Sequence, residues 1–313
     1  MRAFMKFSQM RHLIAAAERG SIHGAARHLG IAQPTISRSL QELERELGVT
    51  LFERSRAGML PTTTGKVVVR RAKAMAAELD RTLAEVAHYK DEGTGSISIG
   101  MSTAAQIAIL PRILRPFRRR YPNVRFTVSE GLFPALEEDI RDGLIDIFVG
   151  AVLTDIRDDT LRVKTLFKNR RIIVARRGHP LANAKSLRDL ADASWITTQV
   201  MADSEREVRA FFGDAGLPTP IIVGQAKSGM SIVTIVASTD LLCPLPEPWS
   251  QIIDQIPIIQ EIKIQEVTYS TPICSVRRAN SQLTPPAQFF FDLIEKAAAN
   301  YVFETQIDSN NSL

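Results

Sequence analysis

The chain has 313 residues, of which 45% are hydrophobic and 23% charged, and its length predicts two or more domains that each bury a core. It contains neither an apolar run of about 18 residues nor a signal-peptide pattern, which argues against a membrane span and predicts a cytoplasmic protein. The formal net charge of +5 is distributed unevenly. Residues 1–90 hold 15 Lys and Arg against 8 Asp and Glu, whereas residues 91–313 hold 24 against 26. This excess of positive charge predicts that the N-terminal region binds a polyanion.

Apolar residues between positions 7 and 47 recur at helical spacing and predict three short helices. Gly20 ends the first helix, and Ser21 is placed to cap the second. Gly30 opens a three-residue turn, after which Pro34 suits the first turn of a third helix. Two helices joined by such a turn form a helix-turn-helix, and the start of the third helix is expected to enter the major groove of DNA. The residues predicted to contact DNA from this helix are Gln33, Pro34, Thr35, Ser37 and Arg38.

A short basic segment follows the third helix. Arg54, Arg56 and Gly58 precede Pro61, and this pattern predicts a β-hairpin wing whose two arginines contact a phosphate backbone or a minor groove. An ordinary surface turn would use the same residue types, so both interpretations stay open at this point.

Residues 65–90 predict one long helix with a coiled-coil seam. The seam residues follow a 4-3-4-3-4 spacing and are Val68, Ala72, Met75, Leu79, Thr82 and Val86. A rod of roughly 40 Å cannot bury this stripe against so small a head. We expect a second copy of the chain as its partner, because a dimer also places two reading helices about 34 Å apart on DNA.

Beyond a Gly-containing linker, strands and helices alternate. The βαβαβ order of residues 96–150 predicts a parallel sheet, and a second unit follows through two further strands at 161–166 and 171–176. A β-rich return at 262–276 and a closing helix at 286–301 complete two α/β lobes that enclose a cleft.

Loops that leave the carboxyl ends of strands predict a ligand site in this cleft. Ser102 and Thr103 follow the first strand and start a helix, where free N–H groups favour an anion. The other residues predicted to bind an effector are Glu130, Phe133, Ala151, Thr197, Thr198, Ser228 and Gly229. Helix capping is the alternative role for each Ser and Thr.

Cys243 and Cys274 are the only cysteines, and their apolar surroundings predict buried thiols rather than a redox switch. Neither they nor the five scattered His residues show the spacing of a metal site. The sequence holds no Gly-x-Ser-x-Gly elbow, phosphate-binding loop or His-Glu-x-x-His motif, so we assign no catalytic residue, metal or cofactor. An enzyme with an attached helix-turn-helix and an architectural DNA binder without a ligand are the alternatives.

The N-terminal signature resembles that of the LysR-type transcriptional regulators. It comprises Ala25-Ala26, Leu29, Gln33-Pro34, Ser37-Arg38, Leu40, Leu43-Glu44, Leu47-Gly48, Leu51-Phe52 and Arg54, with Ala32 where many members carry Ser. The resemblance implies a bacterial regulator with a winged helix-turn-helix and an effector domain similar to periplasmic solute-binding proteins. It is closest to the branch that regulates sugar or aromatic-acid catabolism. Ala151 stands where several members have Arg, which weakens the case for a dicarboxylate effector.

The expected fold is therefore α+β and multidomain. The predicted boundaries are 1–64 for the winged helix-turn-helix, 65–92 for a dimerising linker helix, 93–303 for the effector domain (lobe I 93–163 and 267–303, lobe II 164–266) and 304–313 for a disordered tail. The expected partners are double-stranded DNA with an inverted-repeat operator, an organic acid or sugar derivative, RNA polymerase, and further copies of the chain in a homodimer or homotetramer. An effector in the cleft would shift subunit geometry and the bend of the DNA.

Overall fold

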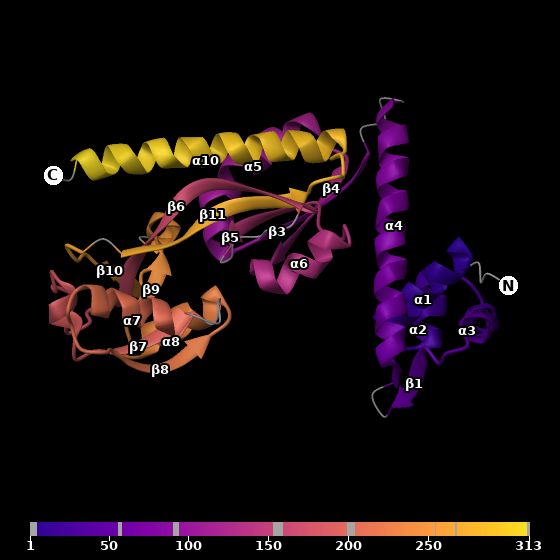
Figure 1. Cartoon of the computed structure of the whole chain (residues 1–313), viewed down its shortest axis with the longest axis horizontal. Helices are drawn as coiled ribbons and strands as arrows, with labels where there is room; N and C mark the ends of the chain where they lie inside the picture. Colours follow the sequence, from indigo (N-terminus) through magenta and orange to yellow (C-terminus); the bar gives the residue numbers. More distant parts are fainter. Residues whose placement is uncertain are drawn as a thin grey trace. The chain divides into compact units, whose positions relative to one another are not determined.

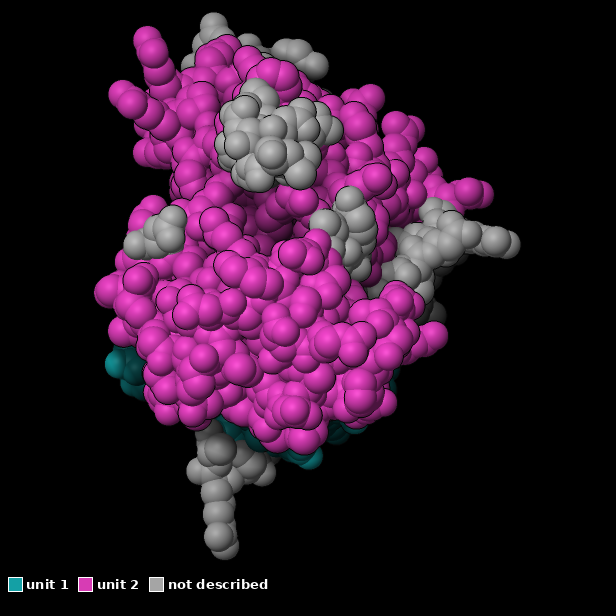
Figure 2. Space-filling model, turned by 90° about the vertical axis from the view of Figure 1, so that its left-hand side faces the viewer, with its two compact units in different colours: residues 1–96, 142–144 teal, residues 97–141, 145–313 magenta. Residues whose placement is uncertain are grey.

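The computed structural model describes residues 5–55, 58–89, 94–152, 159–198, 204–253, 255–266 and 268–311. They divide into two compact units, which we call unit 1 (residues 1–96 and 142–144) and unit 2 (residues 97–141 and 145–313) (Figures 1 and 2). Within the described ranges, no helix combines the length and the apolarity that crossing a bilayer requires.

Unit 1 is a three-helix head followed by a hairpin and a long helix. Its elements are α1 (Phe7–Arg19), α2 (Ile22–Leu29), α3 (Gln33–Leu47), β1 (Phe52–Ser55), β2 (Gly58–Pro61) and α4 (Thr63–Tyr89). Gly30 ends α2 with φ of 66°, a left-handed conformation that glycine adopts without strain and that turns the chain into α3. Ala25 on α2 is fully buried against Leu13 and Ile36, so the small side chain lets the helices cross closely. The predicted helix-turn-helix is confirmed.

Glu44 of α3 fixes the start of the hairpin. Its Oε1 accepts hydrogen bonds from the backbone N–H groups of Leu51 and Phe52, at 2.6 and 3.3 Å. β1 then pairs antiparallel with β2, with Phe52 opposite Pro61. The predicted hairpin is therefore present, with Arg54 in β1, while Arg56 lies outside the described residues.

The long helix α4 is buried near its start and more exposed farther along. Ala72 is fully buried in the core of the head, and Val68 packs against the same core. Farther along the predicted seam, Met75 is 53% exposed and Val86 48% exposed. The beginning of the seam thus packs against the head of its own chain, whereas Met75 and Val86 are about half-exposed.

Unit 2 has two lobes that share one long strand, β6 (Leu161–Arg176). Lobe I contains β3 (Gly95–Met101), α5 (Thr103–Arg120), β4 (Val124–Glu130), α6 (Phe133–Arg141), β5 (Ile147–Ala151), β11 (Thr268–Arg278) and α10 (Pro285–Asn311). Lobe II contains η1 (Leu187–Leu190), β7 (Ser194–Thr198), α7 (Ser204–Asp214), β8 (Ile221–Ala226), α8 (Gly229–Ser238), β9 (Cys243–Pro246), η2 (Glu247–Trp249), α9 (Ser250–Ile253) and β10 (Ile259–Ile262). The main sheet runs in the order β10-β6-β11-β5-β3-β4, and β9 also pairs with β6.

Strand β6 corrects the prediction of two separate strands at 161–166 and 171–176. Its first part pairs with β11, and the pairing continues through Asn169, which lies opposite Ser270. Its last part pairs with β9 and β10. Because β11 pairs with Phe167, Asn169 and Arg170, the ladder bridges the interval between the two predicted strands and makes them one.

Apolar layers on both faces of the lobe I sheet hold it in place. α5 and α10 lie side by side on one face (Figure 1), where Phe117 and Phe290 meet with ring centroids 5.0 Å apart. α6 covers the other face, where Phe133 packs on Phe148. The parallel pairing of β3 with β5 places the carboxyl ends of both strands at one edge, toward lobe II.

The chain end also differs from the prediction. α10 continues to Asn311, so a helix covers most of the segment expected to be a disordered tail. The polar composition suggested disorder, but no Gly or Pro between Tyr301 and Asn311 interrupts the helix that precedes it.

Both cysteines are buried and form no disulfide, as the sequence predicted. Burial raises the pKa of Cys243 to about 12, and it also raises the pKa of Cys274. A thiol with a raised pKa stays protonated at neutral pH and is a poor nucleophile. The two residues therefore act as small apolar side chains of the core.

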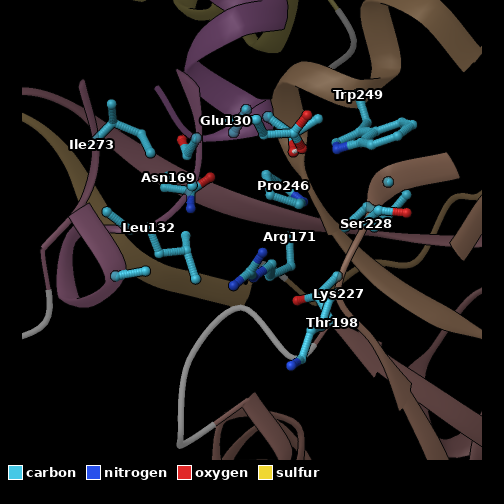
Figure 3. Close-up of a pocket in the computed structure, with 18 of the residues that line it drawn as sticks. Glu130, Leu132, Asn169, Arg171, Thr198, Lys227, Ser228, Pro246, Trp249 and Ile273 are labelled. Carbon is cyan, nitrogen blue, oxygen red and sulfur yellow. Dashed lines mark hydrogen bonds between the residues drawn. The ribbon is translucent and has the colours of Figure 1, made fainter. Parts of the chain in front are cut away.

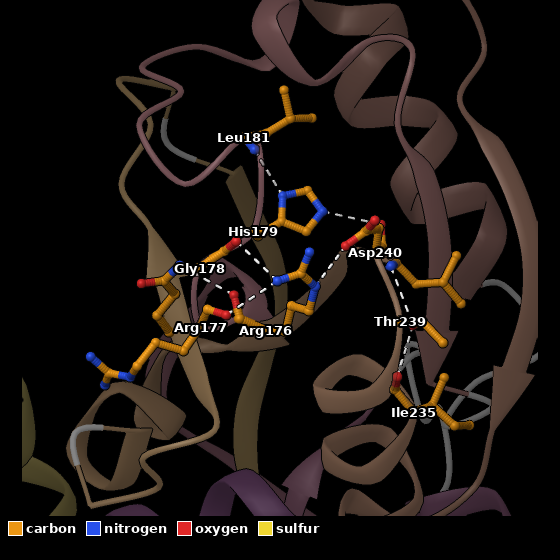
Figure 4. A network of polar contacts seen from close by, with 10 residues as sticks. Arg176, Arg177, Gly178, His179, Leu181, Ile235, Thr239 and Asp240 are labelled. Carbon is orange, nitrogen blue, oxygen red and sulfur yellow. Dashed lines mark hydrogen bonds and ion pairs between the residues drawn. The ribbon is translucent and has the colours of Figure 1, made fainter.

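A polar network ties the turn after β6 to the segment after α8 (Figure 4). His179 is 5% exposed; its Nδ1 accepts from the N–H of Leu181 at 3.0 Å, and its Nε2 donates to the carbonyl oxygen of Asp240 at 3.1 Å. Arg176 donates to the carboxylate of Asp240 at 2.6 Å and to the carbonyl oxygen of Gly178 at 2.9 Å. Only a neutral imidazole with its proton on Nε2 satisfies both backbone groups.

We expect His179→Leu to lower the free energy of unfolding of lobe II by about 2–4 kcal/mol, because two backbone groups lose their hydrogen bonds. Urea unfolding followed by tryptophan fluorescence measures this directly, since the only two Trp residues of the chain lie in lobe II. The matched control is His23→Leu, which changes an exposed histidine on α2. Equal midpoints for the two variants would show that the network does not stabilise the lobe.

Candidate functional site

Helix α3 of the head has one apolar and one polar face. Ile36 and Leu40 are buried in the core, while its opening turn faces solvent. The exposed side chains are Gln33, Pro34, Thr35 and Arg38, with Ser37 half-buried among them. Ala32 precedes the helix and provides no side-chain cap, so the first backbone N–H groups keep no side-chain acceptor. This is the arrangement of a helix that presents its N-terminal turn to another molecule.

A polar contact with α1 helps to fix the orientation of α3. His12 Nδ1 lies 2.8 Å from the hydroxyl of Ser39 and links the two helices. Burial and the charge of Arg11 lower the pKa of His12, so its ring is neutral at physiological pH.

Unit 2 holds a cavity of about 800 Å³ between its lobes (Figure 3), and a furrow crosses the face of this unit seen in Figure 2. Leu132 of lobe I and Trp249 of lobe II stand on opposite sides of the cavity. Leu245, Pro246 and Ile273 add to its apolar lining. A cavity of this size and mixed lining suits a small organic molecule.

The strand shared by the lobes forms part of the cavity wall. Asn169 is 3% exposed, and its Oδ1 has no hydrogen-bond partner among the described residues. Two residues on, the guanidinium of Arg171 donates to both carboxylate oxygens of Glu207, at 3.1 and 2.7 Å. The ion pair with Glu207 therefore offsets the cost of removing the Arg171 charge from water. The side-chain oxygen of Asn169, in contrast, still needs a hydrogen-bond donor.

Two helices begin at the cavity, one from each lobe. Ser102 caps α5 by accepting from the N–H of Ala105 at 3.3 Å, and Ser228 caps α8 by accepting from the N–H of Ser231 at 3.1 Å. Both serines line the cavity as well, so the capping role and the lining role coexist. The partial positive charge of each helix start favours an anionic ligand between them.

Gly229 lets the start of α8 approach Trp249. A Cβ atom at this position would lie 2.9 Å from Cζ2 and 3.0 Å from Cη2 of the indole, and 3.6 Å from Cγ2 of Thr103. Any larger residue must therefore displace the ring. Because Thr103 belongs to lobe I, Gly229 lies at a place where the two lobes touch.

Most of the residues predicted from strand ends lie at the cavity. They are Ser102, Thr103, Glu130, Ala151, Thr198, Ser228 and Gly229, with Thr103 donating to Glu130 at 2.6 Å. Phe133 and Thr197 do not line it. Phe133 is 3% exposed and points into the core beneath α6, and Thr197 is 1% exposed inside lobe II.

Several lining residues were not predicted, above all Asn169, Arg171, Lys227 and Trp249. The first two lie on the strand that the sequence analysis divided at this point. Lys227 stands directly before Ser228, so the predicted cavity position of Ser228 was the available signal for it, and no pattern in the sequence singled out Trp249.

Among the described residues, no group of three His, Cys, Asp or Glu side chains lies close enough to hold a metal ion. A head with a helix-turn-helix, joined in one chain to a two-lobed ligand-binding unit, defines the class of ligand-responsive DNA-binding regulators. Two family models match the chain in this order. The model described as "Bacterial regulatory helix-turn-helix protein, lysR family" matches residues 7–66, and the model described as "LysR substrate binding domain" matches residues 90–299. The chain thus belongs to the LysR family and is a DNA-binding transcriptional regulator with a substrate-binding effector domain.

Curated relatives are similar over most of the chain. The HTH-type transcriptional regulator GbpR of Azospirillum brasilense is 28% identical over 77% of this chain and 71% of its own length. The SDS degradation transcriptional activation protein of a Pseudomonas species is 30% identical over 76% of this chain and 78% of its own length. Both names describe control of transcription.

Solved structures share the fold of the chain. Full-length CbnR, described as a LysR family transcriptional regulator, is 21% identical with a TM-score of 0.74, and the match covers 94% of this chain and 99% of CbnR. CbnR has also been solved with its target DNA, and that structure matches with a TM-score of 0.73 at 21% identity over 94% of this chain and 100% of that one.

Proposed function

We propose that the chain binds an inverted-repeat operator as a dimer, with the exposed face of α3 in the major groove. Gln33 and Arg38 are suited to reading base edges, because amide and guanidinium groups form paired hydrogen bonds with purines. Arg54 and Arg56 would contact the phosphate backbone. The observation that supports this proposal is the division of α3 into a buried face and an exposed polar face.

We expect Arg38→Ala to weaken binding to the specific operator by about 1–3 kcal/mol and to relax specificity at one base pair. The matched control is Arg45→Ala, which removes an exposed arginine from the last turn of the same helix. Gel-shift titrations at fixed salt compare the two variants with the wild type. If both arginine variants bind the operator equally well, the start of α3 does not read the sequence.

The dimer would form through α4. Its exposed apolar residues beyond the head, Met75, Leu83 and Val86, are each about half-exposed and would be covered by the same helix of a second copy. A pair of dimers on DNA, and contact of this assembly with RNA polymerase, complete the proposal.

We expect Met75→Asp to yield a smaller species in sedimentation and at least tenfold weaker operator binding, because a carboxylate in a packed seam has no partner. Asp80→Ala, at an exposed position off the seam, is the control and should keep the wild-type mass. A wild-type mass for Met75→Asp would place the main interface elsewhere.

We propose that the effector is a small organic acid held between the lobes. Arg171 and Lys227 supply positive charge, the capped starts of α5 and α8 supply partial positive charge, and Trp249 provides an apolar wall. Arg171 enters the cavity from β6, so basic character is present although Ala151 carries none. A sugar derivative is the second candidate, supported by the indole face of Trp249, on which a pyranose ring could stack.

The buried amide of Asn169 supports ligand binding most directly, because a polar group this buried is normally hydrogen-bonded. Asn169 also lies where β6 passes from one lobe to the other. A ligand that bonds to it would bind one arrangement of the lobes better than another and thereby shift their equilibrium. We further propose that binding is the whole role of the cleft and that no reaction is catalysed there, in keeping with the regulatory names of the relatives.

We expect Asn169→Ala to shift the effector dose response by at least about tenfold, since a hydrogen bond to a charged group contributes about 1.5–3 kcal/mol. Operator affinity without effector should stay at the wild-type level. The readout is DNA binding titrated with benzoate, citrate, glucose and galactose, and the compound that acts on the wild type is then used for the variants. Asn183→Ala, an exposed asparagine outside the cavity, is the control. A wild-type dose response from Asn169→Ala would remove this residue from the site.

A further inference from the structure

Two arginines face each other at the lobe I end of the strands that join the lobes. The register of β6 and β11 places Arg162 directly opposite Arg277. Side chains of directly opposite residues lie on one face of the sheet, with Cβ atoms about 4.5–5.5 Å apart, so two like charges here repel and weaken the strand pair. An anion bound between the two side chains would remove this repulsion.

Neither Arg162 nor Arg277 forms an ion pair within the part of the chain that the structure describes. The neighbouring basic residue on the same face of β6 behaves differently, because Lys164 lies 2.7 Å from the carboxylate of Glu295 on α10. Arg277 is held in position by Phe291, whose ring centroid lies 5.2 Å from the guanidinium carbon.

Both arginines border an open hollow of about 540 Å³ that shares no lining residue with the cleft between the lobes. Asn280 and Gln282 add neutral hydrogen-bonding groups to its wall, while Nε2 of Gln288, also in the wall, donates to the carboxylate of Asp292 at 2.7 Å. Ser281 also lines it and accepts from Nη2 of Arg278 at 3.0 Å, which fixes the loop that follows β11. The hollow therefore combines two positive charges with the neutral amides of Asn280 and Gln282, and Arg162 is exposed.

We infer that this hollow is a second ligand site, which binds a phosphate dianion as inorganic phosphate or as the phosphoryl group of a small metabolite. A guanidinium offers two parallel N–H donors, so two of them can hold different edges of one tetrahedral anion. A dianion offsets both charges, whereas a single carboxylate offsets only one. The volume of the hollow leaves room for the organic part of a phosphomonoester.

The test compares the full chain with R162Q, R277Q and the control K164Q by calorimetric titration with inorganic phosphate, glucose 6-phosphate and glucose, with chloride keeping the ionic strength constant. We expect the wild type and K164Q to bind at least one phosphate compound saturably and to ignore glucose. R162Q and R277Q should bind it at least tenfold more weakly. Preference for inorganic phosphate or for glucose 6-phosphate identifies the source of the anion.

Thermal unfolding separates a ligand site from a structural role. Without phosphate, R162Q should unfold at the wild-type temperature or above it, because the substitution relieves a repulsion; with phosphate, only the wild type and K164Q should gain stability. Equal phosphate binding by all four proteins would place the anion elsewhere, for example on the basic head. No binding by the wild type, a stronger response to acetate than to phosphate, or a loss of stability in phosphate-free R162Q would each overturn the inference.

Discussion

The continuity of β6 is the constraint on which unit 2 depends. This strand of 16 residues belongs to both lobes, pairing first with β11 and then with β9 and β10. Any rotation of one lobe against the other must therefore bend β6 and its neighbour β11. The register of β11 shifts between Ser270 and Ile273, next to Asn169, which marks the place where the ladder is least regular. Asn169 and Arg171 thus lie at the part of β6 that a change in lobe arrangement would have to bend.

Charge within the cleft follows from this placement. Arg171 sits on a largely buried strand segment, where a guanidinium without a partner would cost several kcal/mol, and its bidentate pairing with Glu207 offsets that cost. Lys227 is exposed and remains hydrated, so it keeps its full charge for a ligand at smaller cost. An anion would therefore gain more from Lys227 and the two helix starts than from Arg171, whose main contribution is a rigid arrangement of donors.

The sequence predicted those parts of the structure that depend on neighbouring residues. Gly30 and Pro34 specify a turn and a helix start, and Ser102 and Ser228 specify caps, so the helix-turn-helix and much of the cleft could be located. The roles of Asn169 and Arg171 depend on pairing with β11, about a hundred residues later, which no local pattern reports. Phe133 shows that a prediction can also fail within a single helical turn. Its neighbours Leu132 and Pro134 line the cavity, whereas the side chain of Phe133 packs in the core.

A regulator of this kind requires that its ligand distinguish between arrangements of the lobes, since equal affinity for two states shifts nothing. Contacts with Ser102 and Thr103 alone would hold a ligand on lobe I in either arrangement. Ser228 and Lys227 reach it only when lobe II is close, which in this structure is the case, because the start of α8 at Gly229 lies beside Thr103 and Trp249. Each tenfold of preference for this arrangement corresponds to about 1.4 kcal/mol, roughly one hydrogen bond from lobe II. Under the proposed function, the polar groups of lobe II and Asn169 on the shared strand would set how strongly the ligand switches the protein, and contacts made by lobe I alone would add affinity that both states share.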